Sequence, residues 1–224
     1  MKSSIVIRSS VFYQRTKQGN KMAKSIYSFF MLAILSFSVT ANTPRQPGEN
    51  IQKDNYYPLV MLETSLGNIV IELNRRKAPA TVNNFLSYVK RGEFDNTLFH
   101  RVIPGYIIQG GGYDPAYQEK KASRSIINES GNGLKNDLHS IAMAREDDPH
   151  SAKRQFFFNM KDNNNLDPGK TWGYTVFGSV VEGTAVLDKI ALVETEYKAI
   201  IRFQDAPREN VLLITATVLP EPQY

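Results

Sequence analysis

The chain has 224 residues, of which 42% are hydrophobic and 11% aromatic, a composition typical of a folded globular protein. Its formal net charge is +5, but residues 1–41 hold six of the 27 Lys and Arg residues and none of the 22 Asp and Glu residues. The remainder therefore has 21 basic and 22 acidic residues. This balance argues against a nucleic-acid-binding domain, because such a domain needs a basic excess of its own.

The absence of cysteine excludes a disulfide framework, thiolate chemistry and a lipoprotein anchor. The three histidines, His100, His139 and His150, are widely separated and show no metal-ligand spacing. The sequence therefore predicts no metal site.

The basic N-terminal segment has the pattern of a secretory signal. Lys21 and Lys24 precede an apolar run over residues 26–39, and small residues follow up to Ala41. We expect residues 1–41 to be an N-terminal extension and signal peptide, with Met22 as an alternative start of more usual signal length. Export to a bacterial periplasm follows, with no stable membrane span after cleavage; an uncleaved anchor is the alternative.

Residues 42–57 are rich in Pro, Asn, Gln and charge, which indicates a flexible leader without a core of its own. The folded domain is expected over residues 58–220. Its first two β-rich runs, 59–64 and 68–73, are separated by a short segment that ends in Gly67. This pattern predicts an antiparallel hairpin.

An amphipathic helix is predicted over residues 78–91, with Pro79 at its start and apolar residues at helical spacing. A second helix is predicted over residues 184–191. Further strands are expected at 97–103, 106–109, 140–144, 155–160, 174–181 and 211–219. Many short strands with two isolated helices predict a mainly β fold, a closed barrel, because closure leaves no unpaired edge.

One strand of this pattern carries a cation. Alternation would place Phe99, Arg101 and Ile103 on one face, so the Arg101 guanidinium would point towards the core. A buried unpaired charge costs several kcal/mol, so this arginine either has hydrogen-bonding partners or lines a cleft open to water. By the same alternation, Phe156 and Phe158 are expected in the core and Phe157 on the opposite face.

Several blocks in the chain share their order with one known family. Phe99-His100-Arg101-Val102-Ile103-Pro104-Gly105, Ile108-Gln109-Gly110-Gly111, Ile141-Ala142-Met143-Ala144, Gln155-Phe156-Phe157 and Val176-Phe177-Gly178 resemble the signature blocks of the cyclophilin-type peptidyl-prolyl cis/trans isomerases. The resemblance covers about residues 59–219. It implies an eight-stranded antiparallel barrel closed by two helices, an active site on the outer surface of the barrel, and no cofactor.

The resemblance also implies roles for individual residues. Arg101 matches the catalytic arginine, and His100 matches a neighbour in the substrate-binding site. Arg145 stands where the family usually has an asparagine that binds the substrate through its main chain. The remaining substrate-binding positions are Tyr106, Ile107, Gln109, Ala144, Gln155, Phe157, Leu166 and Tyr174.

Two departures from the family pattern leave a second function open. Asn165 replaces the indole of many members, which predicts weak sensitivity to cyclosporin, and Arg154 replaces the usual serine. The first hypothesis is a monomeric isomerase acting on X-Pro bonds in unfolded or flexible exported proteins. The alternative is a proline-peptide-binding chaperone with little or no turnover.

Overall fold

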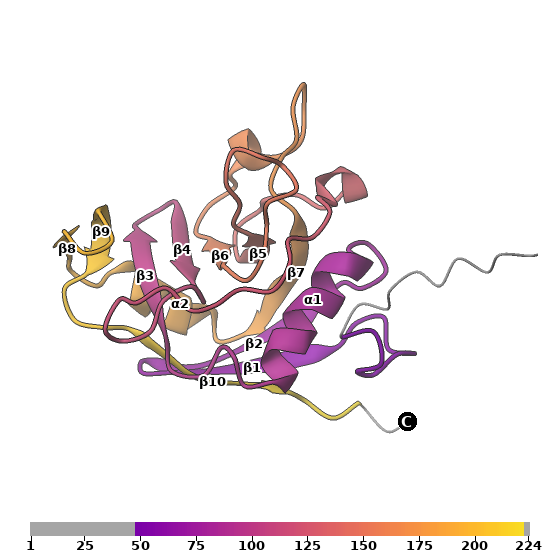
Figure 1. Cartoon of the computed structure of the whole chain (residues 1–224), viewed down its shortest axis with the longest axis horizontal. Coiled ribbons are helices and arrows are strands. Elements are labelled where there is room, and N and C mark those ends of the chain that lie inside the picture. Colours follow the sequence, from indigo (N-terminus) through magenta and orange to yellow (C-terminus); the bar gives the residue numbers. More distant parts are fainter. Residues whose placement is uncertain (1–47, 222–224) are drawn as a thin grey trace, which may run out of the picture. The chain divides into compact units, whose positions relative to one another are not determined.

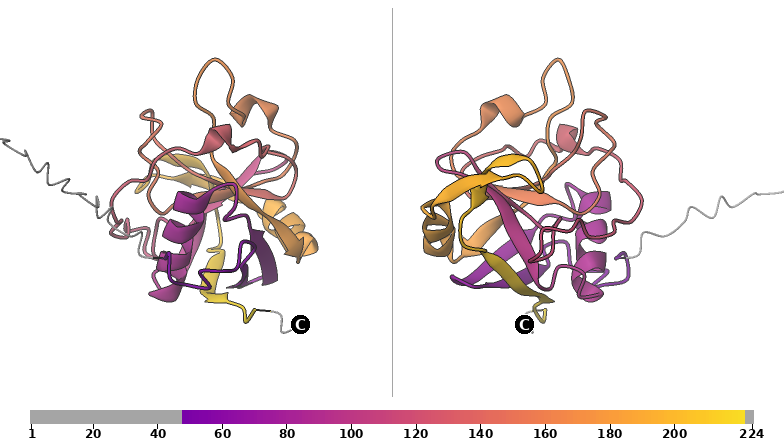
Figure 2. Two further views of the ribbon diagram at one scale, coloured as in Figure 1. Left: turned by 90° about the vertical axis from the view of Figure 1, so that its right-hand side faces the viewer. Right: turned by 60° about the vertical axis from the view of Figure 1, so that its left-hand side comes forward.

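The protein is described by a computed structural model in which residues 48–221 are placed. The predicted extension and signal peptide, the alternative start at Met22 and the first part of the predicted leader lie outside the described residues. Figures 1 and 2 show the arrangement of the elements in this part of the chain. Among residues 48–221, no helix is long and apolar enough to cross a bilayer.

Eight strands form a closed barrel in which every neighbouring pair is antiparallel. Their order around the barrel is β1-β10-β3-β4-β6-β5-β7-β2. The predicted eight-stranded barrel with two helices is therefore confirmed. The bounds of the strands are β1 (Leu59–Thr64), β2 (Gly67–Leu73), β3 (Thr97–Ile103), β4 (Ile107–Gly110), β5 (Ser140–Met143), β6 (Phe156–Asn159), β7 (Val176–Glu182) and β10 (Leu212–Val218).

The helices α1 (Pro79–Lys90) and α2 (Thr184–Ala191) lie on opposite sides of the barrel strands, as both views of Figure 2 show. Both helices were predicted to within one residue at each end. Pro79 occupies the start of α1, where its missing N–H is not needed, and the apolar stripe of the helix is buried. Two short 3₁₀ helices, η1 (Ser130–Asn132) and η2 (Asn164–Leu166), lie in the long loops.

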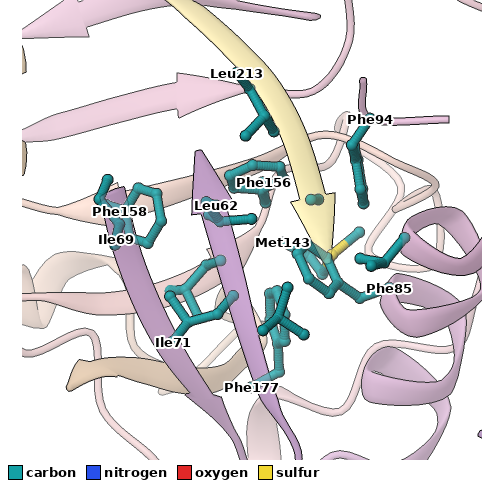
Figure 3. Packing of buried hydrophobic residues seen from close by; sticks show 14 of the residues in the cluster. Leu62, Ile69, Ile71, Phe85, Phe94, Met143, Phe156, Phe158, Phe177 and Leu213 are labelled. Carbon is teal, nitrogen blue, oxygen red and sulfur yellow. The ribbon is translucent and has the colours of Figure 1, made fainter. Parts of the chain in front are cut away.

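Aromatic side chains make up much of the core, which lies inside the barrel and beneath α1. Phe156 and Phe158 point inwards from β6, as predicted, and Phe156 meets Phe85 of α1 edge-on with ring centroids 5.5 Å apart. Figure 3 shows these rings together with Phe94 and Phe177. Gly110 lies between Phe99 and Phe156 in the sheet, and a Cβ there would lie 2.8 Å from the Phe99 ring. A glycine is therefore needed for the rings to pack.

The facing of Arg101 differs from the prediction. Phe99 pairs with Gly110 and Arg101 pairs with Gln109, so His100 is an extra residue in a β-bulge. The bulge reverses the alternation, so Phe99 and Val102 belong to the core cluster while Arg101 is half-buried on the outer face. The expectation that Phe99 and Arg101 share a face was wrong, because regular alternation does not hold across a bulge.

A hairpin that the sequence did not predict lies beside β3. Its strands are β8 (Thr195–Lys198) and β9 (Phe203–Pro207), which form a two-stranded sheet apart from the barrel. Figure 1 shows this hairpin at the edge of the molecule next to β3. Two ion pairs from Arg208, to Glu194 at 2.7 Å and to Glu196 at 3.6 Å, hold its base.

Residues 48–57 do not have the flexible conformation expected of a leader. They form turns against the barrel, and the buried Arg75 side chain donates hydrogen bonds to the carbonyls of Ile51 at 2.7 Å, Asn55 at 2.8 Å and Gln52. Burial lowers the pKa of Arg75. Composition pointed to a leader because the segment is polar, whereas a buried cation from the domain satisfies its carbonyls.

Candidate active site

Four adjacent strands bring the outward-facing residues of the site into one row. Arg101 of β3 pairs with Gln109 of β4, Gln109 pairs with Phe157 of β6, and Phe157 pairs with Ala142 of β5. Side chains opposite one another on neighbouring strands point to the same face. Because neighbouring strands lie about 4.8 Å apart, the backbones at Arg101 and Phe157 are about 10 Å apart. The bulge at His100 is what brings Arg101 into this row.

An apolar cluster covers the outer face of the barrel next to Arg101. Phe157 is 2% exposed and meets Tyr174 edge-on, with ring centroids 5.6 Å apart. Ile107, Tyr106 and Leu166 pack around them. The cluster surrounds an open pocket of about 410 Å³, lined by Arg101, Tyr106, Ile107, Gln109, Ala144, Arg145, Phe157, Leu166, Tyr174 and Phe203. The pocket thus joins an apolar floor to one guanidinium at its edge.

The Arg101 guanidinium makes few contacts with its surroundings. Its Nε lies 3.9 Å from Oδ2 of Asp205, and the two side chains are 34% and 38% exposed. No other ion pair and no hydrogen bond from this side chain occurs within residues 48–221. Its terminal N–H groups are therefore available to a bound molecule.

A second, shallower hollow of about 220 Å³ adjoins the first. Gln109 and Gln155 line it, and the Gln109 amide donates a 2.8 Å hydrogen bond to Oε1 of Gln155. A Cβ at Gly112 would lie 2.6 Å from the Gln155 amide, so the glycine gives this side chain its room. Gln109, Ala144 and Arg145 line both hollows.

The Arg145 side chain holds the loop on the far side of the pocket. Its guanidinium lies over the Tyr174 ring, 4.6 Å from the centroid, and donates hydrogen bonds to the carbonyls of Trp172 at 2.9 Å and Glu146 at 2.8 Å. A cation above an aromatic face fixes the ring as well as the charge. Arg145 therefore positions Tyr174, one of the pocket walls.

A chain of buried amides lies beneath the pocket. Asn163 donates to the Tyr106 carbonyl at 2.9 Å and to Oδ1 of Asn159 at 2.8 Å, and Asn159 donates to Asn136 at 3.2 Å. Asn136 in turn donates to the Asp167 carboxylate at 3.1 Å. This network joins the Tyr106 turn to the loop that carries Leu166, so two walls of the pocket are held at a fixed separation.

Comparisons with known proteins agree with this geometry. A family model described as cyclophilin type peptidyl-prolyl cis-trans isomerase/CLD matches residues 59–218. A peptidyl-prolyl cis-trans isomerase of Streptomyces antibioticus is 50% identical over 164 residues, which cover 71% of this chain and 98% of that protein. The chain belongs to the cyclophilin family. Its class of enzyme is therefore that of the peptidyl-prolyl cis/trans isomerases.

Further cyclophilins show the same relation. Peptidyl-prolyl cis-trans isomerase B of Escherichia coli strain K12 is 46% identical over 164 residues, covering 71% of this chain and 99% of that protein. A crystal structure of a cyclophilin from Cryptosporidium parvum superposes with a TM-score of 0.64 at 25% identity, covering 75% of this chain and all of the other. The resemblance to the family and the fold it implied are confirmed.

The structure brings together nine of the eleven site residues that the cyclophilin resemblance implied, and two lie elsewhere. Gln155 lies in the adjoining hollow, bonded to Gln109. His100 is 0% exposed and stacks on Phe203, with ring centroids 5.6 Å apart, beside Tyr113 at 4.6 Å. A substrate cannot reach a side chain buried in this way, so the prediction of His100 as a substrate-binding residue is not supported.

Burial also decides the charge of His100. Neither ring nitrogen makes a hydrogen bond of normal geometry among the described residues. Desolvation is the largest influence and lowers the imidazole pKa to about 4; the Arg101 charge also lowers it, whereas the Leu98 backbone and the Gln155 side chain act in the opposite direction. At neutral pH this cyclophilin therefore holds a neutral, apolar-packed ring under its candidate catalytic strand.

The two departures from the family pattern have different meanings in the structure. Arg154 is 4% exposed and lies between the Tyr88 and Phe94 rings, outside the pocket. It donates to the carbonyls of Gly111 at 2.7 Å, Lys121 at 2.8 Å and Glu93. Asn165 is exposed at the pocket rim, with its amide 3.5 Å from the Tyr106 hydroxyl. Asn165 therefore lies at the rim of the apolar pocket, whereas Arg154 lines the adjoining hollow beside Gln155.

Two site residues were missed by the sequence interpretation. Phe203 lines the pocket and Asp205 pairs with Arg101, and both belong to the unpredicted strand β9. The sequence offers little to predict them: Phe203 precedes Asp205 by two positions in an otherwise polar segment. Trp172, which is near the pocket in sequence, packs on His150 with centroids 5.3 Å apart and lines a different hollow.

Proposed function

We propose that this cyclophilin accelerates cis/trans isomerisation of X-Pro bonds by combining water exclusion with a hydrogen bond from Arg101. The observation that carries the proposal is the row in which a half-buried guanidinium with free N–H groups lies beside the apolar floor made by Phe157. The pyrrolidine ring of a substrate would occupy the apolar pocket, with the preceding peptide group towards Arg101 and Gln109.

The physical requirement is to favour a twisted amide over a planar one. Amide resonance sets a barrier of about 18–20 kcal/mol to rotation, and water bonded to the carbonyl favours the planar form. As the bond twists, the imide nitrogen becomes pyramidal and gains a lone pair that an N–H of Arg101 can bind. This interaction is stronger in the transition state than in the ground state, which is the condition for catalysis.

The size of this effect is reasonable for one oriented cation. A rate acceleration of about 10⁵ corresponds to about 7 kcal/mol of differential stabilisation. A charge-assisted hydrogen bond in a pocket that excludes water, together with loss of the carbonyl hydration, can supply most of this amount. No bond is broken and the residues involved need no cofactor.

The test is a proline-peptide isomerisation assay with Arg101→Ala. We expect kcat/KM to fall by at least about tenfold, the loss of about 1.4 kcal/mol of transition-state stabilisation. Arg91→Ala is the matched control, because Arg91 is a surface arginine paired with Glu93 outside the pocket. Circular dichroism establishes that both variants fold. Equal turnover by the wild-type protein and Arg101→Ala would contradict the proposed mechanism.

The chaperone alternative is now supported by one residue only. It depended on Asn165 and Arg154, and Arg154, although it lines the adjoining hollow, has its guanidinium bound to backbone carbonyls. Measuring peptide affinity and turnover in the same variants separates the two functions. A pocket that binds proline peptides with micromolar affinity but does not accelerate their isomerisation would favour the chaperone.

We further propose that the substrates are unfolded or flexible exported proteins, and that the folded domain, residues 58–220, acts as a monomer in the periplasm. The proposal depends on the signal-like segment 1–41. Mass spectrometry of the mature protein from a periplasmic extract tests it. A mature N-terminus just after Ala41 is the expected result, and an intact N-terminus in the cytoplasmic fraction would contradict it.

A further inference from the structure

The β8–β9 hairpin reaches the site through side chains alone. β9 pairs only with β8 in the described residues, so no ladder of backbone hydrogen bonds joins the hairpin to the barrel. Phe203 stacks on His100 with an interplanar angle of 27° and meets Tyr113 edge-on at 6.3 Å. This aromatic contact sets the hairpin beside β3, where Figure 1 shows it.

Although the register of β9 against β8 shifts between Phe203 and Ala206, two side chains of β9 lie at the pocket. Phe203 lines the pocket, and Asp205, two residues later, lies next to Arg101 at its edge. The Asp205 carboxylate lies 3.9 Å from Nε of Arg101. The hairpin therefore supplies both an apolar wall and a negative charge next to the guanidinium.

The geometry of the pair matters more than its energy. An exposed or half-exposed ion pair contributes about 0.2–1 kcal/mol, because solvent screens the charges. A guanidinium, however, is a rigid plane, so a carboxylate on its Nε side biases the direction of the two terminal nitrogens by electrostatic attraction, even at 3.9 Å, which is too long for a hydrogen bond. Arg101 has no other ion pair or hydrogen bond within residues 48–221 to give it that direction.

We propose that Asp205 is a positioning residue for Arg101. It holds the guanidinium at Nε so that the terminal N–H groups face the imide nitrogen, and its charge reduces the attraction of the site for acidic side chains next to proline. The proposal rests on the proposed isomerase function. The nearest other cation on the pocket wall, Arg145, is already held by Tyr174 and backbone carbonyls.

The first test compares Asp205→Asn with Asp188→Asn. Asp188 is an exposed residue of α2, so its variant has the same change in charge outside the site. We expect Asp205→Asn to lower kcat by about three- to fivefold with little change in KM, the range that the coupling of a half-exposed pair allows. Asp205→Glu should recover part of the loss, since it keeps the carboxylate, and Asp188→Asn should match the wild type.

The second test is a double-mutant cycle with Arg101→Ala. If Asp205 acts through Arg101, Asp205→Asn should have no effect on the residual turnover of Arg101→Ala. If Asp205 had only a structural role in the hairpin, Asp205→Asn would instead lower the turnover of the wild-type protein and that of Arg101→Ala by the same factor. Thermal unfolding of each variant identifies any loss of fold, and Asp205→Glu serves as the second variant if Asp205→Asn is unstable.

The third measurement uses peptide charge. In Asp205→Asn, the ratio of kcat/KM for a Glu-Pro peptide to that for a Lys-Pro peptide should rise by about twofold at low salt and less at high salt. Equal kcat for Asp205→Asn and Asp188→Asn, or equal losses in both backgrounds, would overturn the inference and leave the isomerase proposal standing. A wild-type protein without isomerase activity would overturn both.

Discussion

Two arginines of this cyclophilin show how one side chain takes opposite roles in two regions of the barrel. Arg154 is 4% exposed and lies on two aromatic rings with three backbone carbonyls as acceptors. Arg101 is 34% exposed and has one distant carboxylate beside it. The first arginine has its donors occupied by the protein, and the second has them available to a substrate.

The difference follows from where each residue lies relative to the loops. Arg154 precedes β6 and reaches the loop residues Glu93, Gly111 and Lys121, which have carbonyls that need donors. Arg101 follows a bulge in β3 and faces the pocket, and within residues 48–221 its side chain makes no hydrogen bond to a carbonyl. The buried Arg154 thus satisfies backbone acceptors, whereas the half-buried Arg101 keeps donors free for the role proposed above.

The largest expected effect comes from the structural arginine. Arg154→Met keeps most of the side-chain volume but leaves three carbonyls without a donor, so the free energy of unfolding should fall by about 4 kcal/mol. Urea unfolding at 15 °C measures this loss. Turnover of the folded variant should fall by less than about threefold, because Arg154 lines only the adjoining hollow and not the apolar pocket.

The matched control is Arg91→Met, which removes an exposed arginine that forms an ion pair with Glu93, donates a hydrogen bond to Ser87 and lies over the Tyr88 ring. Arg91→Met should lower the free energy of unfolding by less than about 1 kcal/mol, as expected for the loss of a surface ion pair. If Arg154→Met were as stable as Arg91→Met, the three carbonyls would not depend on Arg154, and the contrast with Arg101 would fail.

The comparison also explains what the sequence could predict. The hairpin of β1 and β2, both helices and the barrel strands were found because their apolar spacing matches the period of the element that they form. The inward Phe156 and Phe158 and the outward Phe157 followed from simple alternation. These features depend on residues close together in sequence.

The missed features depend on contacts between distant segments. β8 and β9 are polar and end at Pro207, so they have no apolar alternation, and the hairpin is held by Phe203 stacking on His100. The bulge at His100 has no sequence signal that distinguishes it from a regular strand. For this reason the sequence could not predict that the Arg101 side chain points outwards or that Asp205 lies next to it.

His100 is a buried group whose ring nitrogens, unlike the donors of Arg154, make no hydrogen bond of normal geometry within residues 48–221. The pKa of His100 is about 4 in the folded protein and about 6.5 in an unfolded chain. Between these pH values the unfolded state binds the extra proton, so lowering the pH from 7 to 4 should reduce the free energy of unfolding by about 3 kcal/mol through this residue alone.

The measurement is the difference in stability between the wild-type protein and His100→Phe, followed by urea unfolding from pH 7 to pH 4. The variant keeps an aromatic ring against Phe203 and Tyr113 but does not titrate. Its stability relative to the wild type should rise as the pH falls, while carboxylates that titrate in the same range cancel in the difference. His150→Phe is the control, since His150 is exposed. A constant difference across this pH range would show that His100 is not held neutral by burial.

The smallest expected effect concerns the rim of the pocket in the Arg101 region. Asn165 is exposed and reaches only the Tyr106 hydroxyl, so a larger side chain has room there. Asn165→Trp restores the indole that many cyclophilins have at this position and should tighten cyclosporin binding by about tenfold, or about 1.4 kcal/mol.

Asn164→Trp, at the neighbouring exposed position of η2, is the matched control, and its affinity for cyclosporin should rise by less than about twofold. The urea midpoint should stay the same in both, because neither residue contacts the Arg154 region. Inhibition of the wild-type protein by cyclosporin below about 1 µM, or an equal gain from Asn164→Trp, would show that the rim at Asn165 does not limit this ligand.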